Sequence, residues 1–197
     1  MTEERIQRIN NVLQKRQLGL TVILENVEDP RNITAVMRSC DSVRIQDIHI
    51  VKTAVPSNKH FNFKSGRSAA KWLTMHHYNS IEECIATLRP TYQKIYTTAL
   101  SANAISVYDI DFTQSVALIF GNEVMGISAE AKQLADGNCL IPQVGFIQSL
   151  NISVACAVTI YEAFRQRTMA GLYNTTSLPK ERLTSLTELW HSYSENK

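Results

Sequence analysis

The stretch IPQVGFIQSLNISVACAVTIYEAFRQR, from Ile141 to Arg167, holds two patterns from which a fold can be predicted. Its start reads as the end of a strand, followed by a loop with Gly145 and then by a polar cluster of Gln148, Ser149 and Asn151. Its second half is compatible with a long helix, whose apolar residues recur at nearly helical spacing at Leu150, Val154, Val158 and Tyr161. Ser149 and Asn151 could cap this helix or take part in chemistry, and the stretch alone leaves both readings open.

Length and composition are those of one globular α/β domain. A chain of 197 residues has room for one core with short terminal extensions, and 44% hydrophobic with 19% charged residues is ordinary for a soluble protein. No apolar run approaches the roughly 20 residues that cross a bilayer, and the polar start MTEERIQRINN lacks the hydrophobic centre of a secretion signal. We therefore expect a cytoplasmic protein without membrane contact.

The spacing of the cysteines and the placement of the charges indicate which ligands and partners the chain can have. The four cysteines have no paired CxxC spacing, which argues against a zinc site and against a disulfide framework. Although the net charge is only +2, residues 5–24 and 48–81 contain several Lys and Arg and no acid. Two such segments suggest a face that binds a polyanion such as nucleic acid, with ordinary solvated charges as the alternative.

Strand and helix patterns alternate along the chain. Short apolar strands are expected at 20–27, 45–51, 73–78, 94–100, 115–122 and 138–143. Helices are expected at 2–17, 32–43, around Ala69 and Ala70, from a capping box at Ser80 and Glu83 to Leu88, from Ser128 to Ala135, and beyond 179. This alternation predicts a mostly parallel sheet with helices on both faces. We divide the chain into a basic N-terminal helix (1–18), a core (19–171) and a C-terminal helical extension (172–197).

The C-terminal extension carries a second apolar pattern. After a polar linker at 174–179, apolar side chains recur at helical spacing at Leu183, Leu186, Leu189 and Tyr193. A helix of this kind must bury its stripe, either on the rest of the domain or on a partner.

Three polar groups follow predicted strands, at the edge where open α/β sheets bind ligands. The first is Asn32 with Arg38, the second is FGNEVMGIS at 120–128, and the third is the cluster that ends at Asn151. Taken singly, each has an ordinary explanation as a helix cap, a surface charge or a turn.

In this order and at these spacings, with SLNISVA at 149–155 as the most specific match, the three groups resemble the sequence motifs of the SpoU/TrmH class of SPOUT RNA methyltransferases. The resemblance covers essentially the whole chain. It implies a SPOUT fold whose C-terminal part forms a deep trefoil knot, and a homodimer through the motif helices near 33–43 and 150–168. It also implies S-adenosylmethionine as methyl donor, with no metal.

The same resemblance implies a reaction, which is 2′-O-methylation of the ribose of guanosine 18 in the D-loop of tRNA. Methylation of another tRNA or rRNA nucleotide is a second reading. A tRNA-binding relative without catalysis is a third, and a plain nucleotide-binding domain is a fourth. The joint presence of the motif residues favours the enzyme.

Site residues are carried over from the class by motif position. Arg38 would activate the 2′-hydroxyl or, because arginine in proteins stays protonated, clamp a substrate phosphate. Positioning and pocket support would come from Asn32, Glu123, Ser149 and Asn151. Loops with Thr98, Leu100, Gly121, Ile141 and Leu150 would hold the cofactor through backbone groups. Phosphate contacts would come from Arg5, Arg8, Arg16, Arg89, Arg165 and Arg167. Three positions depart from the residues common in the class, namely Arg31, Arg44 and Gln143.

Overall fold

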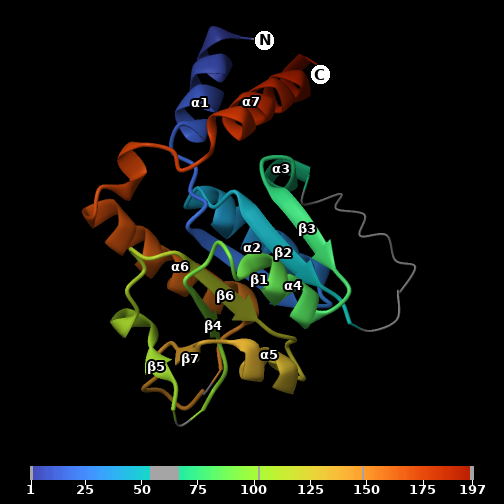
Figure 1. Cartoon of the computed structure of the whole chain (residues 1–197), viewed down its shortest axis with the longest axis vertical. Helices are drawn as coiled ribbons and strands as arrows, with labels where there is room; N and C mark the ends of the chain where they lie inside the picture. The colour runs from blue at the N-terminus through green and yellow to red at the C-terminus, as the bar shows by residue number, and fades with distance from the viewer. Residues whose placement is uncertain (1, 54–66, 102, 148, 196–197) are drawn as a thin grey trace.

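The computed structural model describes residues 2–53, 67–101, 103–147 and 149–195, and shows one twisted sheet covered by helices (Figure 1). Gln148 and most of the predicted basic loop at 53–63 lie outside the described residues. The sheet has seven strands in the order β3-β2-β1-β6-β4-β7-β5, and all the pairings between them are parallel. The strands are β1 (Leu20–Glu25), β2 (Asp47–Val51), β3 (Thr74–Tyr78), β4 (Lys94–Thr97), β5 (Ile105–Ser106), β6 (Val116–Phe120) and β7 (Gly137–Leu140).

The helices lie close to where the sequence predicts them. They are α1 (Glu3–Leu13), α2 (Pro30–Ser42), α3 (Arg67–Ala70), α4 (Ile81–Leu88), α5 (Ala129–Leu134), α6 (Ile152–Met169) and α7 (Lys180–Glu195), with short 3-10 turns at Val107–Asp109 and Leu172–Asn174. The predicted capping box is half formed, since the hydroxyl of Ser80 accepts the backbone N–H of Glu83, while the Glu83 carboxylate accepts that of Asn79. The sequence does not predict strand β5, because two residues are too few to show an alternation of apolar and polar side chains.

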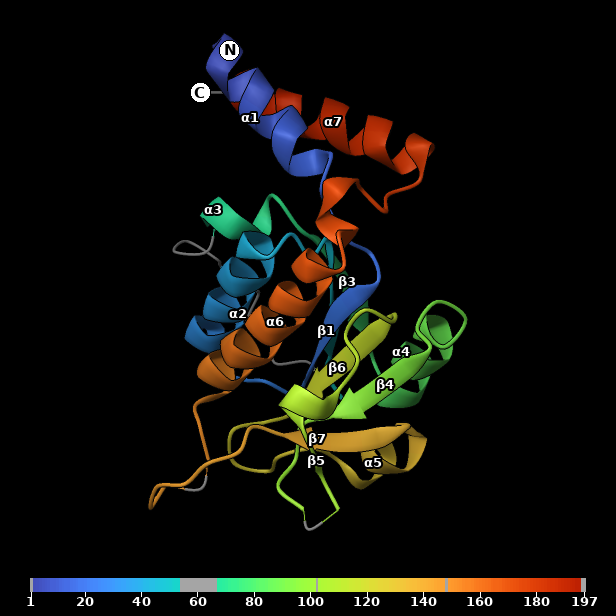
Figure 2. The same cartoon turned by 90° about the vertical axis from the view of Figure 1, so that its left-hand side faces the viewer.

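The predicted parallel sheet with two covered faces is confirmed. All six residues of β1 are buried, and its side chains alternate between two cores. Leu20, Val22 and Leu24 pack with the apolar faces of α2 and α6, whereas Ile23 belongs to the core under α4 and α5. Figure 2 shows α2 and α6 together on one side of the sheet and α4 on the other. Burial on both faces explains why these strands read as continuous apolar runs.

Parallel pairing brings the carboxyl ends of four adjacent strands to one edge. In the sheet β1 lies next to β6, β6 next to β4, and β4 next to β7. The loops that leave this edge begin at Asn26, Gly121, Thr98 and Ile141. All the motif residues except Arg38 therefore lie on, or directly after, loops at one end of the molecule.

The two terminal helices occupy the opposite end, where α1 and α7 lie against each other (Figures 1 and 2). Their contact buries Ile9 and Leu13 of α1 with Leu178, Leu186 and Trp190 of the C-terminal segment. The stripe of α7 thus packs on the chain's own N-terminal helix. Leu189, which we placed in that stripe, is 44% exposed, and Trp190 takes the buried position instead.

In the described part of the chain, none of the helices is both long and apolar enough to cross a membrane.

Candidate active site

Side chains from three different loops form a short hydrogen-bonded chain at the carboxyl edge. The amide nitrogen of Asn32 donates to Oε1 of Glu123 at 2.7 Å, and the amide nitrogen of Asn151 donates to Oδ1 of Asn32 at 3.2 Å. Asn32 is therefore the central member, joined to residues 91 and 119 positions away in the sequence. One residue from each of the three predicted groups takes part, so the structure brings the motifs together.

Asn151 caps the long helix, as one of the two sequence readings predicts, and it also bonds to Asn32. It is the N-cap of α6, where its Oδ1 accepts the backbone N–H of Ser153 at 2.9 Å. The cap does not use the amide nitrogen of Asn151, and this nitrogen donates to Asn32. Because the cap fixes the side chain, the start of the long helix also orients one end of the network.

Glu123 lies on a tight turn that is held by its neighbour Asn122. The amide nitrogen of Asn122 donates to the carbonyl of Asn26 at 2.8 Å, and its Oδ1 accepts the backbone N–H groups of Val124 at 2.8 Å and Met125 at 2.9 Å. The first bond ties the turn after β6 to the end of β1, and the other two hold the turn itself. We did not single out Asn122 from the sequence, because an asparagine in a turn usually bonds only to its own turn.

Gly121 has a structural role in the same turn. A Cβ at this position would lie 2.3 Å from the carbonyl oxygen of Gly126, with which the turn closes. Gly126 itself has a φ of +69°, a conformation that suits glycine. The close approach that Gly121 allows is therefore to the chain's own backbone, and Gly121 is not among the residues that line the neighbouring pocket.

Arg38 stands apart from this network. It is exposed in the middle of α2, six residues and therefore about 9 Å of helix rise beyond Asn32. Among the described residues its guanidinium has no hydrogen-bond or ion-pair partner. The structure thus presents Arg38 as an open positive charge at some distance from the carboxyl edge.

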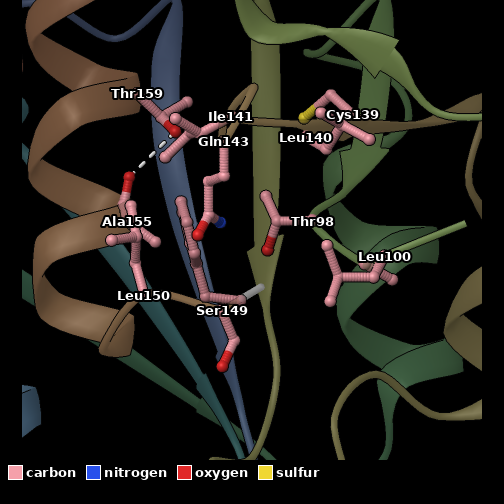
Figure 3. Close-up of a pocket in the computed structure, with 12 residues that line it drawn as sticks. Thr98, Leu100, Cys139, Leu140, Ile141, Gln143, Ser149, Leu150, Ala155 and Thr159 are labelled. Carbon is pink, nitrogen blue, oxygen red and sulfur yellow. Dashed lines mark hydrogen bonds between the residues drawn. The ribbon is translucent and has the colours of Figure 1, made fainter. Parts of the chain in front are cut away.

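A pocket opens beside the network, between the loops after β4 and β7 and the first turns of α6 (Figure 3). Four of the five predicted cofactor residues line it, namely Thr98, Leu100, Ile141 and Leu150, and so does Ser149. Its volume is about 120 Å³, below the roughly 300 Å³ of typical ligand pockets. Figure 3 shows the side chain of Gln143 in the middle of this space.

The walls of the pocket are mostly apolar, and their polar side chains are largely engaged. Thr98 donates its hydroxyl to the carbonyl of Ile119, and Thr159 donates to that of Ala155, each at 2.9 Å. Burial raises the pKa of the Cys139 thiol to about 12, so this residue stays neutral and is a poor nucleophile. The pocket is therefore suited to hold a ligand by apolar contact and backbone groups, without covalent attachment.

The six predicted phosphate-binding arginines divide into three kinds. Arg8 is exposed and Arg5 half-buried, both on α1. Arg165 and Arg89 reach the surface but are paired, Arg165 with Glu162 at 2.7 Å and Arg89 with Asp136 at 2.5 Å.

Arg16 and Arg167 form the third kind, because the structure places them inside the fold. Arg16 is fully buried and bonds to Asp41 and to the carbonyls of Ile45 and Trp72. Arg167 is 4% exposed and donates to the carbonyls of Gly19, Phe112 and Gln114. Each guanidinium joins segments that are distant in sequence, and both residues are buried, although Arg16 also borders a hollow at the terminal-helix end. Arg167 was predicted from its motif position and Arg16 from the basic N-terminal segment, and neither signal carries information on burial.

Within the described residues, no three His, Cys, Asp or Glu side chains are grouped so that they could hold a metal ion.

Proteins of known family that are similar to this chain agree with the class of enzyme that the site geometry suggests. Residues 19–161 match the model of the SpoU rRNA Methylase family. The chain belongs to this family of RNA methylases, and its sheet with flanking helices is the fold of the family's solved structures.

Individual relatives are similar over most of their length. A tRNA (guanosine(18)-2′-O)-methyltransferase of Thermus thermophilus is 41% identical over 191 residues, which cover 96% of each chain. The enzyme of the same name from Escherichia coli K12 is 37% identical over 174 residues, which cover 88% of this chain and 75% of that one.

Two solved structures extend the comparison to the fold. The Aquifex aeolicus TrmH/SpoU tRNA modifying enzyme has a TM-score of 0.87 at 30% identity, with 98% of this chain and 97% of that chain covered. The SpoU methyltransferase AviRb of Streptomyces viridochromogenes, solved in complex with the cofactor AdoMet, has a TM-score of 0.67 at 26% identity, with 79% and 62% covered.

Proposed function

We propose that this chain methylates the 2′-oxygen of guanosine 18 in tRNA, with S-adenosylmethionine as the donor. The observation that carries the proposal is the chain of hydrogen bonds through Glu123, Asn32 and Asn151 beside an apolar pocket. The names of the relatives that align over nearly the whole chain point to the same substrate. All four cysteines are free and buried, which fits a reducing compartment such as the cytoplasm.

The pocket residues fit the proposed donor in chemical character. An adenosine and a methionine chain need apolar walls with a few polar groups, which is what the lining residues from the loops after β4 and β7 provide. S-adenosylmethionine supplies a methyl group on a positively charged sulfur. Because the space is small and Gln143 lies in it, we infer that this side chain swings aside when the ligand enters.

The network positions the reacting groups. Asn32 is held from both sides, so its amide has one orientation and keeps the Glu123 carboxylate at a fixed place next to the pocket. Fixed polar groups of this kind orient a ribose for attack along the line of the bond that breaks. When the 2′-oxygen takes the methyl group, its proton must leave to a base or to water.

Arg38 supplies positive charge to this step. Since arginine stays protonated at neutral pH, we assign it to binding a phosphate that flanks the target ribose and to stabilising charge on the 2′-oxygen as the proton leaves. Its exposed position and lack of a partner among the described side chains leave the guanidinium ready for such a contact.

In a homodimer, Arg38 of one subunit would come close to an active site. The outer face of α6 is apolar although exposed, with Val154 at 47% and Tyr161 at 50% exposure. Tyr161 touches Ser42 of α2 at 3.1 Å, and Ser42 lies one helical turn after Arg38 on the same face. We propose that a second copy covers this combined α2–α6 face, and we keep the trefoil knot as part of the proposed fold.

The test is transfer of labelled methyl from S-adenosylmethionine to an unmodified tRNA transcript, with nuclease mapping of the label. We expect label on the ribose of guanosine 18, and none on a transcript with 2′-deoxyguanosine at that position. Label on another nucleotide would show that the enzyme methylates a different position of the RNA. Absence of transfer, with tRNA still bound, would favour the non-catalytic reading.

A further inference from the structure

Asn138 in β7 uses its side-chain amide to hold the loop that leaves β4. This loop begins after Thr97 and supplies Thr98, Ala99 and Leu100 to the wall of the pocket in Figure 3. Oδ1 of Asn138 accepts the backbone N–H of Ala99 at 2.8 Å, and its amide nitrogen donates to the carbonyl of the same residue at 2.7 Å. The side chain therefore pairs with Ala99 as the backbone of a neighbouring strand would.

Two further hydrogen bonds complete the partners of this amide. Its Oδ1 also accepts the hydroxyl of the buried Thr97 at 2.9 Å, and its nitrogen also donates to Oγ of Ser101 at 3.0 Å. An amide side chain has two N–H donors and an oxygen with two lone pairs, so all of its bonding positions are used. Asn138 is not among the residues that line the pocket. It can therefore act on a ligand only through the loop that it holds.

The loop needs this support because the ladder between the two strands ends at its start. The pairing of β4 with β7 runs to Thr97 and Asn138. Beyond that point the backbone of Ala99 requires other partners, and the amide of Asn138 supplies both of them. On the opposite side, the backbone N–H of Thr98 donates to the carbonyl of Ile119 in β6 at 3.1 Å. The loop is thus fixed from both neighbouring strands.

The bond to the carbonyl of Ala99 also directs the next residue. This carbonyl and the N–H of Leu100 belong to one planar trans peptide, so they point in opposite directions. Because Asn138 holds the carbonyl, the N–H of Leu100 points away from Asn138. Within the part of the chain that the structure describes, this N–H has no hydrogen-bond partner. It is therefore available to a ligand, in a direction that Asn138 fixes.

We propose that Asn138 is a positioning residue of the donor site, which holds the loop at 98–101 in its binding shape and thereby sets the affinity for S-adenosylmethionine. This rests on the proposed function, from which it takes S-adenosylmethionine as the ligand. A loop that is ordered beforehand loses little conformational freedom on binding, so more of the contact energy appears as affinity. Without Asn138, part of that energy is spent on ordering the loop.

Isothermal titration calorimetry of the full chain with S-adenosylmethionine tests this role. Asn138→Leu keeps a side chain of similar size and removes all four hydrogen bonds. We expect its Kd for the donor to rise about tenfold or more, the effect of losing one or two ordinary hydrogen bonds. The KM for S-adenosylmethionine should rise equally. In contrast, kcat at saturating donor should stay within about threefold, because a preformed loop stabilises the ground state and the transition state alike.

Gln166→Leu is the matched control, because the amide of Gln166 in α6 also pairs with the backbone of a loop. Its Oε1 accepts the N–H of Phe112 at 2.9 Å, and its nitrogen donates to the carbonyl of Ile110 at 3.0 Å. Gln166 is not among the residues that line the pocket. Urea unfolding should show a comparable loss of stability, with the Kd for the donor within about twofold of the wild-type value. Equal losses of donor affinity in both variants would show a general loosening of the fold and overturn the proposal.

Asn138→Asp decides the matter if Asn138→Leu fails to fold. An ionised aspartate still accepts from Ala99 and Thr97, but it loses both donated bonds and repels the carbonyl of Ala99. Its Kd for S-adenosylmethionine should rise about threefold or more, and a wild-type Kd would overturn the proposal.

Failure of the proposed function gives a different result. A wild-type protein that binds S-adenosylmethionine but transfers no methyl group to tRNA would overturn that function, while the donor affinity of Asn138→Leu would still decide the role of Asn138. A wild-type protein that does not bind the donor would overturn both.

Discussion

The two ends of this molecule use polar side chains in opposite ways. At the carboxyl edge, amides and a carboxylate bond to one another across three loops, so that the site is a connected unit of Glu123, Asn32 and Asn151. At the terminal-helix end, Arg8 and Arg16 are eight residues apart, yet Arg8 is exposed while Arg16 is completely buried.

This difference shows what residue type alone can and cannot say. A motif with fixed spacing specifies several residues together, and the fold brings those residues into contact as a group. A single arginine describes only a charge, and the fold decides whether that charge binds a ligand or fastens two segments together. Substitutions at the two ends of the molecule test how far this division holds.

The largest effect is expected for Arg38→Ala, which should lower the single-turnover rate of methyl transfer at least about 100-fold. Since the residue is exposed and has no partner among the described side chains, the free energy of unfolding should change by less than about 0.5 kcal/mol. Rapid-quench assays and urea unfolding give the two numbers. Arg38→Lys should recover only part of the rate, because lysine lacks the planar fork. Near-normal turnover in Arg38→Ala would mean that the charge has no part in the reaction.

A second, smaller effect is expected for Asn122→Ala. The change removes the three hydrogen bonds that hold the turn of Glu123, while Glu123 itself is kept. We expect a loss of about 10- to 100-fold in kcat and of about 1–3 kcal/mol in stability. Steady-state kinetics at a temperature where the variant is fully folded separates the two. Unchanged kcat would show that the turn does not need this support.

Much of the fold followed from simple patterns. Runs such as those of β1 and β6 are apolar because they are buried on both faces, and that burial is why the parallel sheet could be predicted. The positions of the three motifs at one edge followed from the parallel arrangement. The joint spacing of Asn32, Glu123 and Asn151 indicated that these residues act together.

Other features depend on contacts that no local pattern encodes. Asn122 bonds to Asn26, 96 residues away, and this hydrogen bond can form only because β1 and β6 are neighbours in the sheet. The stripe that we named on α6 faces outward, because this helix is apolar on more than one side and Ile152, Cys156 and Ile160 pack inward. Spacing therefore identified the helix but not the face that it buries.

A third prediction compares the two α1-end arginines directly. Arg16→Met leaves Asp41 and the carbonyls of Ile45 and Trp72 without their donor. Breaking a buried ion pair costs about 3–5 kcal/mol, and the side chain of Asp41 is 33% exposed, which lowers our expectation to about 2–3 kcal/mol. Arg8→Ala should stay within about 0.5 kcal/mol. Urea unfolding of both variants decides, and equal stabilities would contradict the assigned roles.

A fourth prediction concerns acid stability near the contact of α7 with the sheet. Burial, together with the charge of His76, lowers the pKa of His49 to about 4, with Asp47 acting in the opposite direction and Arg182 adding to the lowering. His49 is therefore neutral in the fold but protonated in the unfolded chain below about pH 6.5. The unfolded state then binds more protons, so stability falls as the pH drops from about 6.5 to 4.

The size of this loss can be bounded. Lowering a histidine pKa from 6.5 to about 4 corresponds to a loss of about 2–3 kcal/mol across that window. Burial alone would raise the pKa of Asp47, but hydrogen bonds from His76 and Arg182 outweigh it and hold that pKa below its usual range. Asp47 therefore adds its own loss only at lower pH, as the pH falls through its depressed folded-state value. Urea unfolding of His49→Gln between pH 7 and 4.5 should show a slope clearly shallower than that of the wild-type protein, and identical slopes would assign the acid sensitivity to another group.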